Sequence, residues 1–167
     1  MEIGATKAVQ DRLKTTKIEE SKGASLVFCW DTHLTKIKGR NVLFIVNASN
    51  RYTIAMTDIE PRNWNYYTMY IRSVIHGVMQ EMGYSEDQIG QYFKISGDTT
   101  VTKTHGRKSV GGINRMVMDA QYFGKKLEKE AKYQWELSEY LNRDICQPEG
   151  FDAYGYPSEL FKLDMER

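Results

Sequence analysis

The alternation of apolar and polar residues predicts strands in the first third of the chain. Residues 26–37 alternate through Leu26, Phe28 and Trp30, and residues 52–57 alternate in the same way. Residues 42–46 are continuously apolar, as expected of a strand that is covered on both faces. Because residues 38–40 and 48–50 are short turn-forming segments, the simplest arrangement is an antiparallel meander.

Apolar residues spaced three and four apart predict helices in the rest of the chain. The strongest periodicity covers residues 67–82, and residues 85–88 have the form of a capping box that opens another helix. Further helices are expected over residues 4–14 with Thr6 as N-cap, from Ser109 onwards, over the charged residues 125–145, and near residue 160. Residues 99–104 are rich in β-branched side chains, which predicts a fourth strand.

These elements predict an α+β fold. We expect a small antiparallel sheet, made of a meander of three strands plus one later strand, packed by helices. The core domain is expected over residues 1–123. Residues 124–167 are expected to form a charged helical C-terminal extension that packs on the same domain.

The composition narrows the class of protein. The chain has 167 residues, of which 41% are apolar, so it can bury a core. No apolar run approaches the length of a membrane span, and the first residues lack the features of a signal peptide, so we expect a cytoplasmic protein without a membrane partner. The two cysteines, Cys29 and Cys146, form no CxxC pair, and no HExxH pattern occurs; we therefore expect neither a metal site nor a cofactor.

The charge is unevenly distributed although the net charge is only +1. Residues 94–115 contain five Lys and Arg against one Asp, whereas acidic residues outnumber basic ones in residues 116–167. A protein that coats DNA would be basic throughout, so generic DNA binding is not expected. The short basic segment suits one compact anionic ligand.

The basic segment has the ingredients of a phosphate site. A helix that starts near Ser109 would direct free backbone amides and the positive end of its dipole toward the preceding turn. Gly106 allows close backbone approach, and Lys103, Arg107 and Lys108 supply positive charge around the same turn. The alternative is a solvated basic turn in front of a normally capped helix.

The same segment resembles a family of small bacterial, plasmid and phage proteins that is catalogued as a domain of unknown function. The matching residues are Lys103, Thr104, Arg107, Gly111 and Asn114, together with Thr6-Lys7, Trp30, Leu34 and Val46-Asn47 upstream. The chain departs from the family pattern at His33, Lys108 and Ser109. The resemblance covers roughly residues 5–120 and implies an α+β fold without an assigned activity.

Aromatic and histidine residues offer further chemistry. Trp30 and Trp64 could stack on a nucleobase, although packing in the core is the alternative for such residues; Trp64 lies off the apolar stripe of the long helix, which favours exposure. His33-Leu34-Thr35 has the His-x-Thr form of two-histidine phosphoesterases. A second triplet is missing, because His105 is followed by Gly106-Arg107.

The sequence thus leads to three functional hypotheses. The first is a binding protein for a phosphorylated small molecule, foremost a nucleotide, which could sequester a signalling nucleotide of host defence because the resembling family occurs on phages and plasmids. Its expected ligand-binding residues are Lys7, Trp30, Trp64, Lys103, Thr104, Arg107, Lys108 and Asn114. The second is a metal-independent phosphodiesterase that uses His33, His105 and Lys103. The third is an interaction module that inhibits a macromolecular partner. A homodimer remains open in each case.

Overall fold

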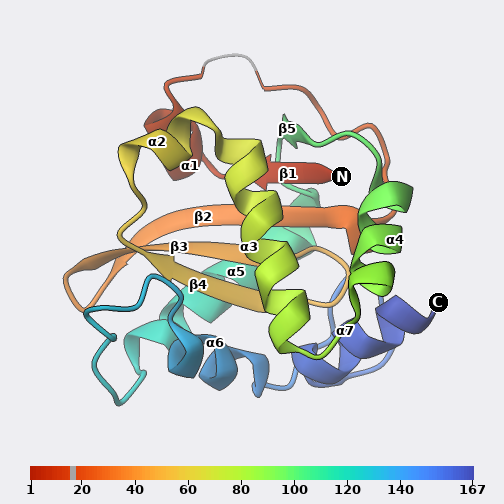
Figure 1. Cartoon of the computed structure of the whole chain (residues 1–167). Coiled ribbons are helices and arrows are strands. Elements are labelled where there is room, and N and C mark those ends of the chain that lie inside the picture. Colours follow the sequence, from red (N-terminus) through yellow and green to blue (C-terminus); the bar gives the residue numbers. More distant parts are fainter. Residues whose placement is uncertain (16–17) are drawn as a thin grey trace.

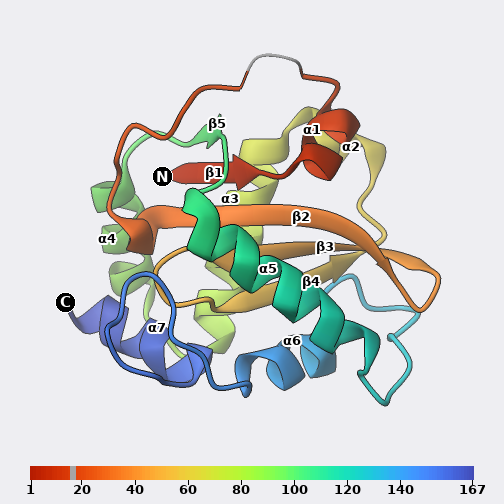
Figure 2. The ribbon, with the colours of Figure 1, turned by 180° about the vertical axis from the view of Figure 1, so that it is seen from behind.

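The protein is a five-stranded open mixed sheet with helices on both faces (Figures 1 and 2). The computed structural model describes residues 1–15 and 18–167. The strands are β1 (Glu2–Ala5), β2 (Cys29–Ile37), β3 (Arg40–Asn47), β4 (Thr53–Thr57) and β5 (Thr100–Thr102), in the order β4-β3-β2-β1-β5. β2, β3 and β4 pair antiparallel, whereas β1 pairs parallel with both β2 and β5.

Helices cover the two faces of this sheet. They are α1 (Lys7–Leu13), α2 (Pro61–Asn65), α3 (Tyr67–Glu81), α4 (Glu86–Ser96), α5 (Gly106–Gln121), α6 (Trp135–Asn142) and α7 (Pro157–Glu166), with a short 3-10 helix, η1, at Leu26–Phe28. α3 and α4 lie in front of the sheet in Figure 1, and α5 crosses the opposite face in Figure 2. The α+β class is confirmed, as are the three-stranded meander, the later strand β5 and the capping box at Ser85.

The strand β1 was not expected from the sequence. Residues 4–14 predict a helix, but the helix begins only at Lys7, after Thr6, and residues 2–5 form a strand between β2 and β5. A strand of four residues is too short to show an alternation of apolar and polar side chains. In addition, one face of β1 bears only Glu2 and Gly4, so it has no apolar side chain. The sheet is therefore mixed, with an antiparallel half and a parallel half.

The segment of residues 125–145 is helical only at α6. Its first part instead runs beside the edge strand β4, where the amide of Thr57 donates to Lys132 O at 2.7 Å and the amide of Gln134 donates to Ala55 O at 2.9 Å. The side chain of Gln134 donates to the carbonyls of Glu128 and Ala131. Pairing with an exposed strand edge thus outweighs the helix propensity of this charged segment.

The two faces of the sheet bury separate apolar cores. Alternate residues of β3 point to opposite sides, so Leu43 packs with Ile71 and Ile75 of α3, whereas Phe44 packs with Ile113 of α5. Both sides of β3 are fully buried, which explains its continuous run of apolar residues.

Both tryptophans that were expected to contact a ligand lie in the core on the α3 side. Trp30 is 1% exposed, and its Nε1 donates to the hydroxyl of Tyr92 at 2.9 Å. Trp64 is 9% exposed and stacks on Tyr67, with ring centroids 5.5 Å apart. The expectation that either indole stacks on a nucleobase is therefore wrong, because core packing already covers both rings.

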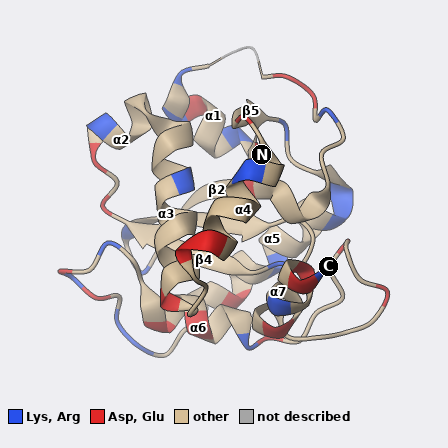
Figure 3. Ribbon diagram, turned by 45° about the vertical axis from the view of Figure 1, so that its right-hand side comes forward, with Lys and Arg blue, Asp and Glu red and all other residues tan. Residues whose placement is uncertain are grey.

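The surface bears both signs of charge. Figure 3 shows acidic residues on α6 and α7, at the opposite end of the molecule from β5. Among the described residues, no helix is long and apolar enough to cross a membrane.

Two tyrosines of the α3-side core provide a matched test of buried polar groups. The hydroxyl of Tyr92 accepts from Trp30 and donates to Val27 O at 2.7 Å, whereas the buried hydroxyl of Tyr70 has no hydrogen-bond partner among the described residues. Tyr92→Phe should lower the free energy of unfolding by about 1–3 kcal/mol, because it leaves the buried Nε1 of Trp30 unpaired and removes one of the two hydrogen bonds to Val27 O, the other coming from Asn47. Tyr70→Phe should leave it unchanged or raise it. Denaturant unfolding of both variants measures the difference, and equal effects would contradict this assignment.

Candidate functional site

The parallel half of the sheet has a polar surface on its α5 side. The parallel register places Glu2 beside Cys29 and Gly4 beside Asp31. In the antiparallel half, the same face bears Phe44 and is apolar. Glu2 and Asp31 are 4% and 0% exposed, so two carboxyl groups are buried where α5 begins.

Gly4 allows the segment after β5 to approach β1 closely. A Cβ at this position would lie 1.8 Å from Asp31 Oδ1 and 3.0 Å from the Cα of Thr104. The space that a side chain would occupy is thus filled by the Asp31 carboxylate and by the backbone that leads into α5. Gly4 is required here for close approach and not for an unusual backbone angle.

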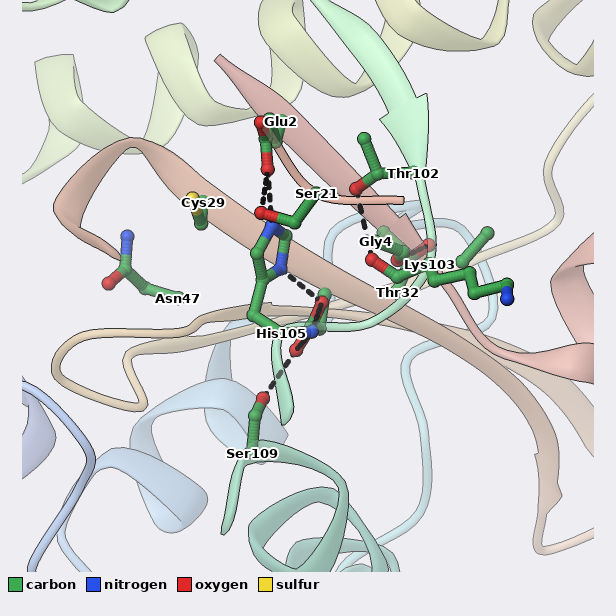
Figure 4. Close-up of polar contacts among 12 residues, drawn as sticks. Glu2, Gly4, Ser21, Cys29, Thr32, Asn47, Thr102, Lys103, His105 and Ser109 are labelled. Carbon is green, nitrogen blue, oxygen red and sulfur yellow. Dashed lines mark hydrogen bonds and ion pairs between the residues drawn. The ribbon is translucent and has the colours of Figure 1, made fainter. Parts of the chain in front are cut away.

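His105 enters this space and joins the two buried carboxylates (Figure 4). Its Nδ1 lies 2.7 Å from Asp31 Oδ1, and its Nε2 lies 3.0 Å from Glu2 Oε2. The backbone amide of His105 also donates to Asp31, and the imidazole is only 3% exposed. Because its two carboxylate partners come from β1 and β2, His105 fastens the segment after β5 onto both strands.

The surroundings of His105 favour its charged form. Burial alone lowers the pKa of a histidine, but the hydrogen bonds and charges of Asp31 and Cys29 outweigh burial and raise the pKa of His105 to about 10. Burial would raise the pKa of Glu2, yet hydrogen bonds from Ser21, from the amide of Lys22 and from His105 hold it below its ordinary value. An enclosed imidazolium with both nitrogens bonded is not suited to be the proton shuttle of a phosphodiesterase.

Asp31 occupies the N-terminal end of α5. This helix begins at Gly106, three residues earlier than the sequence predicts, and Ser109 does not cap it. Instead, the hydroxyl of Ser109 and the amide of His105 donate to the Asp31 carboxylate. The helix dipole therefore stabilises an anion of the protein itself, and the phosphate site expected at this helix terminus is already filled.

Some of the predicted ligand-binding residues lie at a second place, where the neighbouring strands β1 and β5 end. These strands are parallel neighbours, so Thr6 and Lys7 after β1 lie at the same edge of the sheet as Lys103 and Thr104 after β5. The hydroxyl of Thr6 lies 3.1 Å from Nδ1 of His33, whose pKa is lowered by burial. This edge is exposed, since the side chain of Lys7 is 82% exposed and that of Lys103 is 56% exposed.

The remaining predicted residues lie apart from this edge. Arg107 and Asn114 are exposed and lie two helical turns apart on the side of α5 that faces away from the core residue Ile113. Lys108 donates to the carbonyl of Pro148 in the C-terminal segment. Arg107 and Lys108 are neighbours in sequence, but their side chains lie on different sides of α5.

Glu2 and Asp31 were missed by the sequence reasoning. The sequence pattern assigns Glu2 to no element, and Asp31 falls within the alternating residues 26–37 as one of their polar positions. One signal could have identified Asp31. It is a charged residue on the same face of β2 as Ile37, which packs in the α5-side core. A groove of about 440 Å³ between α5 and α6 contains none of the predicted residues.

Comparison with known proteins identifies the family. A family model described as "Domain of unknown function (DUF6933)" matches residues 2–160, so the chain belongs to this family. The expected resemblance to an uncharacterised family is confirmed, and the match extends past residue 120 into the acidic C-terminal segment. Searches of curated proteins and of solved structures found no match.

The close approach at Gly4 predicts a large effect of one added methyl group. Gly4→Ala should lower the free energy of unfolding by about 1–3 kcal/mol or more, because neither the Asp31 carboxylate nor the Thr104 backbone can move without breaking the contacts of His105. Gly90→Ala, at an exposed position inside α4 with open space around it, is the matched control and should stabilise the protein by up to about 1 kcal/mol. Thermal or denaturant unfolding measures both; a neutral Gly4→Ala would contradict the described packing.

Proposed function

We propose that this member of the DUF6933 family binds a phosphorylated small molecule, with nucleotides as the first class to test, at the edge of the sheet where β1 and β5 end. One observation carries the proposal: the chain leaves these two parallel neighbours toward opposite faces of the sheet. After β1 it enters α1, whose Val9 packs in the α3-side core, and after β5 it enters α5, which packs in the other core. In open sheets, ligands bind outside the carboxyl ends of parallel strands at such a switch point.

The groups at this edge suit a phosphate. Lys7 and Lys103 offer ammonium groups, and Thr6 and Thr104 offer hydroxyls that can donate to phosphate oxygens. Lys7 pairs with Asp11 at 2.7 Å and Lys103 pairs with Glu20, but ion pairs this exposed contribute only about 0–1 kcal/mol. A phosphate can therefore replace these carboxylates at little cost.

The proposal is narrower than the set of residues expected from the sequence. Trp30 and Trp64 are buried in the core and cannot contact a base, and Arg107 and Asn114 lie along the exposed side of α5. We therefore propose that the residues at this edge recognise the phosphate of the nucleotide, and we assign no residue to its base. His33 is the remaining histidine at the edge, because His105 is enclosed by Asp31 and Glu2. These contacts favour binding without turnover, in keeping with sequestration of a signalling nucleotide.

A binding experiment tests this proposal directly. The purified protein is incubated with a mixed panel of cyclic and ADP-ribose nucleotides, the bound fraction is denatured, and the released molecules are identified by mass spectrometry. We expect an intact nucleotide. A cleaved nucleotide would instead favour a phosphodiesterase, and recovery of no nucleotide would contradict the proposal and direct attention to a protein partner.

The position of the site is tested by two lysine variants. Lys103→Ala should weaken binding of the recovered nucleotide about 10–100-fold, because a hydrogen bond to a charged group contributes about 1.5–3 kcal/mol. Lys129→Ala, at an exposed lysine between α5 and α6, should leave the affinity unchanged. Isothermal titration of both variants measures the affinities. Equal losses would show that only the overall charge matters, and an unaffected Lys103→Ala would place the ligand elsewhere.

A further inference from the structure

The buried cluster around His105 contains more donor chemistry than a structural ion pair requires. Cys29 lies beside Glu2 in the parallel register, and the ligand atoms of Glu2, Cys29 and His105 all lie within 4.8 Å of one another. These three side chains offer one oxygen, one sulfur and one nitrogen donor. We propose that Glu2, Cys29 and His105 form a buried zinc-binding site, a role that goes beyond the proposed nucleotide binding and does not depend on it.

The geometry is close to that of a bound ion. Zinc lies about 2.0–2.3 Å from its nitrogen, oxygen and sulfur ligands, so the ligand atoms of a tetrahedral site are roughly 3–4 Å apart. Nε2 of His105 and Oε2 of Glu2 are already 3.0 Å apart. A small outward movement of the Glu2 carboxylate is therefore enough to admit the ion between them.

The surrounding contacts orient two of the three donors, His105 and Glu2. Nδ1 of His105 lies 2.7 Å from Asp31, which itself accepts from the hydroxyl of Ser109. A carboxylate on the far nitrogen of a metal-bound histidine fixes the tautomer that directs the Nε2 lone pair at the metal. Ser21 Oγ and the amide of Lys22 donate to Glu2 at 2.6 and 2.8 Å and so orient its carboxylate.

Charge and donor type favour zinc. Glu2 and the thiolate of Cys29 together carry two negative charges, which balance one divalent cation that is bound to a neutral imidazole. Binding breaks the S–H bond of Cys29 and removes the proton shared at Nε2 of His105, and both protons leave to solvent. A thiolate disfavours magnesium and calcium, which prefer oxygen ligands. With three donors among the described residues, a water molecule is expected as the fourth ligand.

Sequence motifs could not reveal this site, because its donors are 27 and 76 residues apart along the chain. The absence of a CxxC pair excludes only sites whose cysteines are neighbours in sequence. The parallel pairing of β1 with β2 and the fold-back after β5 bring the three residues together.

The test uses the full chain after treatment with a chelator and no nucleotide. Cobalt(II) is titrated as a spectroscopic substitute for zinc. The expected result is one equivalent bound with a thiolate-to-cobalt charge-transfer absorption that zinc then abolishes. Cys29→Ser should lose this absorption, whereas Cys146→Ser should retain it, since Cys146 is the other buried cysteine and lies in the C-terminal segment. No absorption in the natural protein, or an absorption that persists in Cys29→Ser, would overturn the proposal.

X-ray absorption of the zinc-loaded natural protein needs no variant and therefore remains informative if Cys29→Ser fails to fold. One sulfur among nitrogen and oxygen ligands is the expected first shell; a shell without sulfur, or with two or more, would overturn the assignment. Ser109→Ala, which removes a hydrogen bond to Asp31, should weaken zinc binding up to about 10–100-fold, as changes in the outer shell of metal sites do. An unchanged affinity would contradict the described role of Asp31.

Discussion

The contact of His105 with Asp31 and Glu2 is the interaction on which the arrangement of the parallel half depends. Its three members come from β1, β2 and the segment after β5, so this one cluster connects the three parallel strands with the start of α5. Buried carboxylates are costly unless they are paired and hydrogen-bonded. Each carboxylate here has at least two donors, which come from His105, Ser109, Ser21 and the amide of Lys22.

The cluster also decides which groups remain free to meet a ligand. It places a carboxylate of the protein at the N-terminal end of α5, where a phosphate would otherwise be stabilised. It fixes the backbone at His105, and Lys103 and Thr104 immediately before it are thereby held at the edge of the sheet beside Thr6 and Lys7. The proposed ligand edge and the buried cluster are therefore distinct sites, and the second supports the first.

The same donors would serve a zinc ion without any change of fold. The buried cluster has two carboxylates against a single imidazolium, and a thiol lies next to them. A Zn²⁺ ion would take the place of the two protons of Cys29 and His105, so it would leave the net charge of the cluster unchanged while bonding directly to its donors. Zinc would also join β1, β2 and the segment after β5 more firmly, which would stiffen the edge at which Lys103 and Thr104 lie.

The sequence by itself determined the elements whose side chains have a regular period. The meander, α3, the capping box at Ser85 and the later strand were all predictable, because each buries an apolar face or satisfies its own backbone locally. The sequence also led to the proposed ligand residues Lys7, Lys103 and Thr104, which stay a prediction.

Tertiary structure decided the features that depend on partners far along the chain. β1 exists because β2 and β5 supply its hydrogen bonds, and residues 132–134 pair with β4 because this strand offers a free edge. The burial of Trp30 and Trp64 and the enclosure of His105 follow from what packs over them, which no local pattern encodes. A sequence specifies short-range periodicity directly, whereas long-range contacts become visible only when the chain has folded and brought residues 2, 31 and 105 together.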